Sequence, residues 1–151
     1  VQTCALPIWT VTVFDMYAML LQGDKTQDAR LANRDGETQI TVNSVGALEY
    51  GVMGLLRGNN VEAGSTYTVS FDVASDTTRE MIVTVEDKEY SRYLDERITV
   101  TPQTTHYSFD VTFDKDMTTD LKFQLGNIAD AASLPPHTVT ISSISWEKSE
   151  Q

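Results

Sequence analysis

The stretch Val61-Glu-Ala-Gly-Ser-Thr-Tyr-Thr-Val-Ser-Phe-Asp72 contains a turn followed by a β-strand. Gly64 and Ser65 form the turn, because both residue types favour reversals of the chain. After the turn, apolar and polar residues alternate one by one. The apolar set is Tyr67, Val69, Phe71 and Val73, and the polar set is Thr68, Ser70 and Asp72. Alternation of this kind is typical of a strand with one buried face and one wet face.

Similar short patterns recur along the whole chain. The expected strands are Ala29–Arg34, Glu37–Asn43, Leu48–Leu56, Thr66–Ala74, Glu80–Glu86, Arg97–Val100, His106–Phe113, Asp120–Leu125 and Thr138–Trp146. None of these segments has the 3.6-residue periodicity of an amphipathic helix. Many short strands with turns at regular spacing predict an all-β fold, a β-sandwich of jelly-roll topology.

Three local signals refine this expectation. Asp35-Gly36 predicts a tight hairpin, because both central positions of such a turn need positive φ. The apolar phase shifts between Ile141 and Ile144, which predicts a β-bulge at Ser142-Ser143. The long loop Gly126–His137 is expected to cover one end of the sandwich.

Composition narrows the choice of partner. The 151 residues suit a single domain, and the net charge is −11. An acidic domain repels phosphate backbones, so nucleic acid is excluded as a partner, and alginate or pectate is disfavoured unless a metal bridges them. The longest apolar run, Met16–Leu21, is far shorter than the ~20 residues of a membrane helix, so no membrane partner is expected. A neutral ligand fits best, although acidity that serves only solubility is the competing interpretation.

The first eight residues, Val1–Ile8, back-translate to gtt-cag-acg-tgt-gct-ctt-ccg-atc, the end of a common short-read sequencing adapter. We therefore expect residues 1–8 to be a non-native, adapter-derived leader from a metagenomic assembly, and residues 9–151 to be one domain. The sole cysteine, Cys4, would then carry no function and can form no internal disulfide. The alternative is a native leader without defined structure.

Sequence patterns typical of catalytic sites are weak in this chain. The two histidines, His106 and His137, lack the spacing of metal ligands. No nucleophile elbow, phosphate loop or Cys/His pair is present. Carboxylates are plentiful, but in so acidic a chain some pair always has a separation suitable for a glycosidase. We therefore assign no catalytic residue and expect no enzyme.

Sugar binding has better candidates. A sugar site needs flat aromatic rings that stack on pyranose faces, together with amides and charged groups that pair with hydroxyls. Strand phase places Glu86 and Gln124, together with Lys122, on a wet face. Tyr90, Tyr93 and Asn127 lie in the adjoining turns. Rim or core packing of the tyrosines, and simple solvation of Gln124, are the competing interpretations.

A series of short motifs lies between Gly36 and Trp146. They are Glu49-Tyr-Gly-Val-Met53, Ser65-Thr-Tyr67, Thr84-Val-Glu86, Tyr90-Ser-Arg-Tyr-Leu94, Tyr107-Ser-Phe109, Phe123-Gln-Leu-Gly126 and Val139-Thr-Ile-Ser-Ser-Ile-Ser-Trp146. In this order they resemble the motifs of carbohydrate-binding modules of the family 4/9 type. The resemblance implies a concave cleft that binds single β-glucan or xylan chains, in a module appended to a secreted glycoside hydrolase. By position, it implies that Tyr90, Gln124 and Glu86 are cleft residues; Arg79, Tyr50 and Tyr93 match less closely.

The chain also departs from the pattern of these modules. Met53 replaces a glutamine, and Ser142 replaces an aspartate that helps to hold a structural calcium in the family. A calcium site needs several hard oxygen ligands, so neither calcium nor another cofactor is expected. The loop Ile128–His137 is a further difference that could reshape one end of the cleft.

The preferred hypothesis is a non-catalytic, extracellular bacterial module that binds a neutral β-glucan and targets a covalently linked hydrolase to its polymer. The alternative is a structural or cell-surface jelly-roll spacer without sugar binding, which the changes at Met53 and Ser142 favour slightly. A third possibility is a small glycosidase or lyase.

Overall fold

The computed structural model describes residues 10–13 and 20–149. The strands in these ranges are β1 (Thr10–Val13), β2 (Leu20–Gly23), β3 (Gln27–Arg34), β4 (Glu37–Val45), β5 (Val52–Val61), β6 (Thr66–Ser75), β7 (Arg79–Glu86), β8 (Arg92–Val100), β9 (Thr105–Thr112), β10 (Met117–Gln124) and β11 (His137–Lys148). A short 3-10 helix, η2, spans Ala131–Ser133. No helix in the described ranges is long and apolar enough to span a membrane. The expected leader at residues 1–8, with Cys4, lies outside the described residues.

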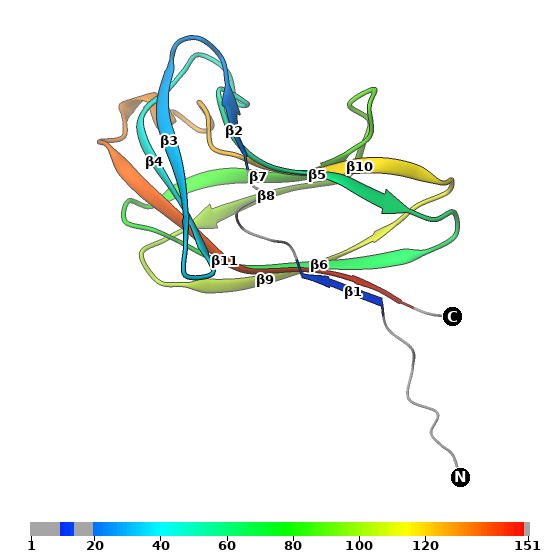
Figure 1. Cartoon of the computed structure of the whole chain (residues 1–151). Coiled ribbons are helices and arrows are strands. Elements are labelled where there is room, and N and C mark those ends of the chain that lie inside the picture. Colours follow the sequence, from blue (N-terminus) through cyan, green and yellow to red (C-terminus); the bar gives the residue numbers. More distant parts are fainter. Residues whose placement is uncertain (1–9, 14–19, 150–151) are drawn as a thin grey trace.

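The strands form two antiparallel sheets that face each other (Figure 1). The six-stranded sheet has the order β3-β4-β11-β6-β9, and β1 also pairs with β11. The five-stranded sheet has the order β2-β5-β10-β7-β8. Neighbours in each sheet are mostly distant in sequence, as jelly-roll topology requires. The predicted β-sandwich of jelly-roll topology is therefore confirmed.

Strand β6 shows why the opening sequence pattern determines this architecture. It lies inside the six-stranded sheet, between β11 and β9, and its burial alternates at every residue. Val69, Phe71 and Val73 point between the sheets and are at most 1% exposed. Thr68, Ser70 and Asp72 point to the outer face. Their side chains hydrogen-bond there to Asp110, Ser145 and His106 of the neighbouring strands.

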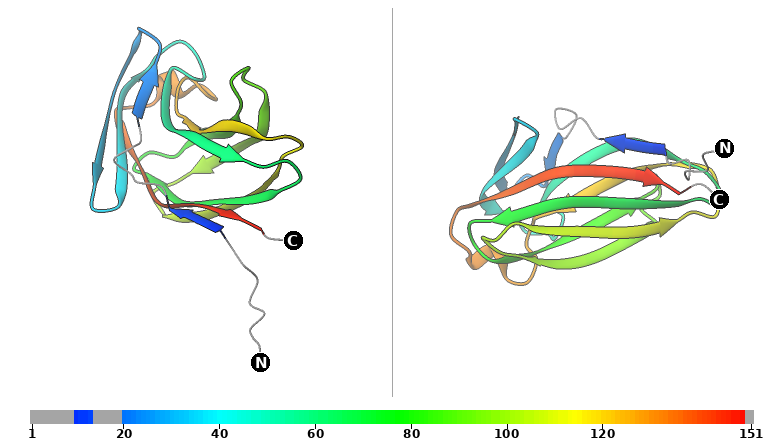
Figure 2. Two further views of the ribbon diagram at one scale, coloured as in Figure 1. Left: turned by 45° about the vertical axis from the view of Figure 1, so that its right-hand side comes forward. Right: turned by 90° about the horizontal axis from the view of Figure 1, so that it is seen from below.

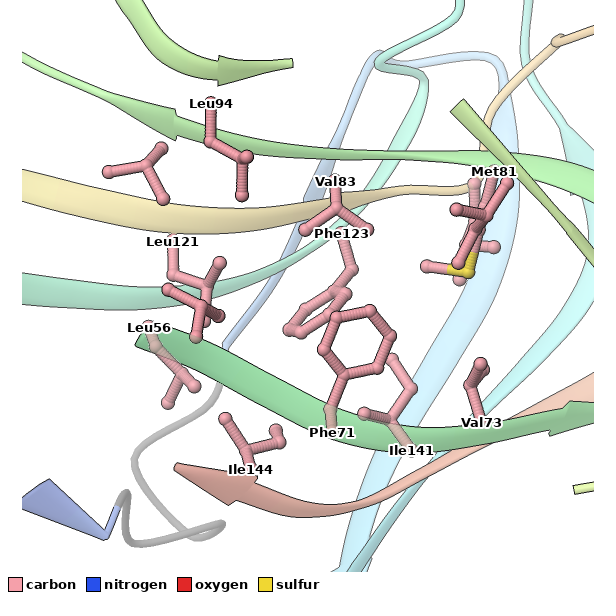
Figure 3. Close-up of a cluster of buried hydrophobic side chains, with 14 of the residues drawn as sticks. Leu56, Phe71, Val73, Met81, Val83, Leu94, Leu121, Phe123, Ile141 and Ile144 are labelled. Atoms are coloured by element: carbon pink, nitrogen blue, oxygen red, sulfur yellow. The ribbon is translucent and has the colours of Figure 1, made fainter. Parts of the chain in front are cut away.

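The core lies between the two sheets and joins residues from both (Figure 3). Phe71 from the six-stranded sheet meets Phe123 of β10 from the five-stranded sheet. Their ring centroids are 5.1 Å apart and the rings are inclined at 84°, an edge-to-face contact. Neither ring is exposed. This contact joins the sheet that carries the opening motif to the centre of the opposite sheet.

Two local predictions are confirmed. Asp35 and Gly36 have φ values of 54° and 79°, as the hairpin between β3 and β4 requires. In β11, which runs along β6 in the view from below (Figure 2), the register shifts between Ser142 and Ser145. Ser143 has a φ of 53° at this bulge, so the apolar phase changes while Ile141 and Ile144 both stay buried.

The predicted strand boundaries differ from the structure most at β5 and β8, and β1 and β2 were not predicted. The expected strand Leu48–Leu56 begins only at Val52, because the Gly51 N–H donates to the Leu48 carbonyl and closes a turn. Strand β8 begins at Arg92 rather than at Arg97. Its first half carries polar residues that obscure the alternation in the sequence, although Leu94 still points into the core.

The loop between β10 and β11 covers one end of the sandwich, as predicted. Ile128 and Ala131 are buried, and Ala131 belongs to the core cluster. The single turn η2 is closed by the Ala131 carbonyl, which accepts the Leu134 N–H at 3.1 Å. Residues of this loop therefore pack onto the core and extend it at one end of the sandwich.

The contact between Phe71 and Phe123 makes a stability prediction. We expect Phe123→Ala to lower the free energy of unfolding by about 3–5 kcal/mol, because it leaves a cavity against the Phe71 ring. Urea denaturation measures the effect. Tyr90→Ala, which removes an aromatic ring that is 73% exposed, is the control and should cost about 0.5 kcal/mol or less. Equal losses in the two variants would contradict this description of the core.

Candidate functional site

The outer face of the five-stranded sheet collects residues from its three central strands. Because side chains alternate along a strand, the residues between the core positions of β5, β10 and β7 all point outward. The pairing aligns Met53, Gln124 and Ile82 in one row across these strands. Leu55, Lys122 and Thr84 form the next row. Polar, charged and apolar groups thus lie side by side on one surface.

This surface is hollowed into a cleft of about 620 Å³, within the size range of ligand sites. One side and part of the floor come from β2, β5 and the loop before β5, with Gln22, Tyr50, Met53, Leu55 and Arg57. The other side and the rest of the floor come from β7, β8, their connecting turn and β10, with Glu86, Tyr90, Arg92, Asp120, Lys122 and Gln124. In Figure 1 the β7–β8 turn rises above the sheet, and the turn that joins β2 to β3 rises on the other side.

Tyr90 is held at the rim by a self-contained turn. The Asp87 side chain accepts the N–H groups of Glu89 and Ser91 through the same oxygen, Oδ1, both at 2.9 Å. The Tyr90 N–H donates to the Asp87 carbonyl at 3.1 Å, and the φ of Tyr90 is 65°. These bonds stabilise the left-handed conformation, which is unfavourable for a bulky residue. The ring is left 73% exposed at the cleft.

Tyr50 lies on the loop before β5. Hydrogen bonds from the first residues of the β10–β11 loop hold the Tyr50 loop in place. The Gly126 N–H donates to the Glu49 carbonyl at 2.9 Å, and the Asn127 N–H donates to the Leu48 carbonyl at 2.8 Å. A Cβ atom at position 126 would lie 2.2 Å from the Leu48 oxygen, so only glycine permits this approach. The Tyr50 ring is 51% exposed.

A buried ion pair lies on the cleft floor. Lys122 Nζ donates to Glu86 Oε1 at 2.9 Å, and the two side chains are only 9% and 4% exposed. Arg92 Nε lies 3.4 Å from the other oxygen of Glu86. The Lys122 ammonium also lies 4.9 Å from the centre of the Tyr90 ring, a cation–π contact. Glu86 thus fixes Lys122, which in turn supports the ring of Tyr90.

Two polar atoms on the cleft-facing side of the sheet lack a hydrogen-bond partner among the described residues. They are Gln124 Oε1 and Thr84 Oγ1, and both are buried. A buried acceptor without a partner costs about 1–3 kcal/mol, so such atoms are expected to bind water or a ligand hydroxyl. Gln124 lines the cleft, and its amide oxygen is therefore the natural acceptor for a hydroxyl there.

Four of the predicted binding residues are brought together. Tyr90, Gln124, Glu86 and Tyr50 all line the same cleft, although they come from four separate segments of the chain. Glu86 and Gln124 are buried on its floor, whereas both tyrosine rings project from its rim.

The other three predicted binding residues lie elsewhere. Arg79 has the inward phase of β7, and its guanidinium donates to the Gly126 carbonyl at 3.0 Å. Tyr93 lies at a register shift between β7 and β8, which turns its ring toward Phe113, 5.2 Å away between centroids. The Asn127 side chain accepts the Ala132 N–H at 3.2 Å within its own loop. The structure thus places Arg79, Tyr93 and Asn127 outside the lining of the cleft.

The cleft also contains residues that the predicted set lacks: Gln22, Met53, Leu55, Arg57, Arg92, Asp120 and Lys122. Strand phase does point to Lys122 and Asp120, because both share the phase of Gln124. Met53 and Leu55 lie within the expected strand Leu48–Leu56, but they were not chosen as binding residues. Arg57 was missed because β5 continues beyond the expected end, to Val61. Arg92 reaches the cleft through the register shift beside Glu86, which no sequence pattern reveals.

Arg79 and His137 form a buried contact at the end of the sandwich, outside the cleft. The Arg79 guanidinium donates to His137 Nε2 at 3.0 Å, while His137 Nδ1 donates to the Pro135 carbonyl at 2.8 Å. His137 is thus a neutral imidazole. Burial lowers its pKa below 6.5; nearby Arg79 acts in the same direction, whereas the Pro135 carbonyl and Asp76 act against it. Burial also lowers the pKa of Arg79 to about 10.

This contact predicts acid sensitivity. Below pH 6.5 the unfolded chain protonates His137 while the folded protein resists, so the unfolded state binds more protons and the free energy of unfolding falls. We expect this loss to begin as the pH falls through 6.5 and to continue until the folded protein also takes up the proton, measured by urea denaturation. His137→Gln, which retains an acceptor for Arg79, should reduce the slope. His106→Gln alters an exposed histidine on the six-stranded sheet and should leave the His137 contribution intact; the reverse pattern would contradict the assignment.

Among the described residues, no group of three or more histidine, cysteine, aspartate or glutamate side chains is arranged to hold a metal ion.

Comparisons with known proteins identify the family. The model of the carbohydrate binding domain family (CBM4/9) matches residues 21–133, which is most of the chain and includes every residue that lines the cleft. The protein therefore belongs to this family of carbohydrate-binding modules. A search of curated proteins gives no significant match.

Solved structures agree with the fold. A structure described as CBM4 structure and function has a TM-score of 0.71 and 20% identity over 86% of each chain. The N-terminal cellulose-binding domain of Cellulomonas fimi β-1,4-glucanase C has a TM-score of 0.71 and 21% identity, covering 97% of this chain and 99% of that chain. A CBM29-2 variant complexed with cellulohexaose has a TM-score of 0.59 and 18% identity, covering 92% and 91%. At such identities the likeness establishes the architecture alone.

Proposed function

We propose that this module binds a single chain of neutral β-glucan, with β-1,3 or β-1,4 linkages, in the cleft of the five-stranded sheet. The observation that carries the proposal is the cleft itself. Two exposed tyrosine rings stand on its rim, and the free Gln124 amide oxygen lies on its floor. Rings stack on the apolar faces of pyranoses, and a buried amide oxygen accepts a sugar hydroxyl. Family membership makes a carbohydrate the expected occupant.

The solved neighbours support a glucan. The Cellulomonas fimi domain is described as cellulose-binding and comes from a β-1,4-glucanase, and the CBM29-2 variant was solved with cellulohexaose. Xylan is the next candidate, because its backbone offers similar pyranose faces without the hydroxymethyl group. The net charge of −11 favours a neutral main chain over a densely anionic one.

We further propose that the module acts without catalysis. In this proposal it is linked to a glycoside hydrolase outside the cell and raises the concentration of that enzyme near its polymer. Such targeting needs only modest affinity. A few stacked rings and hydrogen bonds should give a Kd of about 10⁻⁴ to 10⁻⁶ M, or about 5–8 kcal/mol.

Native affinity electrophoresis tests the ligand class. Residues 10–151 are run through gels that contain barley β-glucan, laminarin, hydroxyethyl-cellulose, xylan, mannan or alginate. We expect retardation by a neutral β-glucan and none by alginate. Binding to none of these polymers would contradict the proposal and favour the structural spacer, and release of reducing sugar would indicate an enzyme.

The Tyr90 ring is the most direct test of the site. We expect Tyr90→Ala to weaken binding of the retarding glucan about tenfold, because stacking on one ring contributes about 1–1.5 kcal/mol. The free energy of unfolding should fall by only about 0.5 kcal/mol or less, since the ring is 73% exposed.

Leu48→Ala is the matched control for the Tyr90 substitution. Leu48 is an exposed apolar residue on the Tyr50 loop, 42% exposed, and it does not line the cleft. Its removal should leave binding unchanged. Equal binding by wild type and Tyr90→Ala would remove this cleft as the site.

A further inference from the structure

The charged groups that line the cleft are, with one exception, engaged by other protein groups. Glu86 contacts both Lys122 and Arg92, and Arg92 also pairs with Asp95 at 3.2 Å. Asp120 Oδ1 accepts the Gly58 N–H at 3.3 Å. The exception is Arg57 of β5, which is exposed and takes part in none of the ion pairs among the described residues.

A bulge between β5 and β10 explains why Arg57 has no acidic partner. The register places Leu56 opposite Leu121 and Asn59 opposite Thr119, so both Arg57 and Gly58 face Asp120 alone. The Asp120 carboxylate accepts the backbone N–H of Gly58, whose φ is 82°. A bulge of this kind re-aims a side chain, and here it leaves a guanidinium at the cleft without a carboxylate in contact.

The charge balance of the cleft is opposite in sign to that of the whole chain. Three basic residues and two acidic residues line it, whereas the chain carries a net charge of −11. Salt screens the distant surface charges over about 8 Å at physiological ionic strength, so a single anionic group in the cleft responds mainly to its neighbours. A polymer with a carboxylate on every sugar would instead run along the acidic surface and be repelled.

We propose that Arg57 forms a subsite for a carboxylate carried at intervals on an otherwise neutral polysaccharide, such as a glycan with occasional uronic acid groups. This inference rests on the proposed function, since the neutral main chain must still occupy the cleft. The planar guanidinium matches a carboxylate with two parallel N–H···O bonds, which a neutral hydroxyl cannot reproduce. Arg57 is then a residue that sets specificity, while Tyr50, Tyr90 and Gln124 bind the main chain.

Three samples of one β-glucan test the inference by affinity electrophoresis. The first is neutral, the second has a small fraction of its C6 hydroxymethyl groups oxidised to carboxylates, and the third is the second sample with those carboxylates reduced back to alcohols. We expect wild type to bind the lightly oxidised glucan about fivefold more tightly than either neutral sample at low salt. Added salt should abolish this preference and leave neutral binding unchanged.

Three variants assign the effect to Arg57. Arg57→Gln should lose the preference for the oxidised glucan and keep its affinity for the neutral one. Arg57→Lys keeps the charge without the bidentate geometry and should retain part of the preference. Arg34→Gln removes an exposed arginine at the end of β3, outside the cleft lining, and should behave as wild type.

The contrary outcomes separate the two proposals. If wild type binds all three samples equally, or if Arg57→Gln weakens all three alike, the carboxylate subsite is overturned and glucan binding stands. Binding to none of the samples would overturn the proposed function, and the subsite with it.

Discussion

The alternation of side chains in β10 is the constraint on which the rest of the structure depends. Phe123 contacts Phe71 between the sheets, and its chain neighbours Lys122 and Gln124 point into the cleft. Core and cleft are thus built from consecutive residues of one strand. A shift of one residue in its pairing would place the charged residues in the core and the ring in the cleft. The packing of the sandwich therefore also fixes the register of the cleft floor.

The buried ion pair of Lys122 and Glu86 shows how the cleft can hold desolvated charges without destabilising the folded protein. Removing both ions from water is costly, and only close contact and additional partners offset the cost. Arg92 supplies a second cation to Glu86, and the Tyr90 ring covers the ammonium. The same contacts order the side chains before any ligand arrives. Binding to a preformed site of this kind loses less free energy to the ordering of side chains than binding to a flexible site.

Much of the fold and part of the site were predictable from the sequence, because both follow the period of two along each strand. The hairpin at Asp35-Gly36 and the bulge at Ser143 follow from local chemistry. Arg79 and Tyr93 could not be placed in this way. Arg79 shares the inward phase of Met81, but it precedes the expected strand Glu80–Glu86, and Tyr93 is redirected by a register shift between two strands. Arg57 depends on a bulge opposite β10, which is a property of two segments far apart in sequence.

The turn that carries Tyr90 is a closed unit. The Asp87 carboxylate and the backbone bonds within residues 87–91 satisfy the turn internally, and both of its ends belong to paired strands. Because the core takes no support from this segment, its five residues can be exchanged for another loop while the sandwich beneath stays intact. The scaffold thus permits loop grafting at one wall of the cleft, a route by which ligand preference can diversify without a new fold.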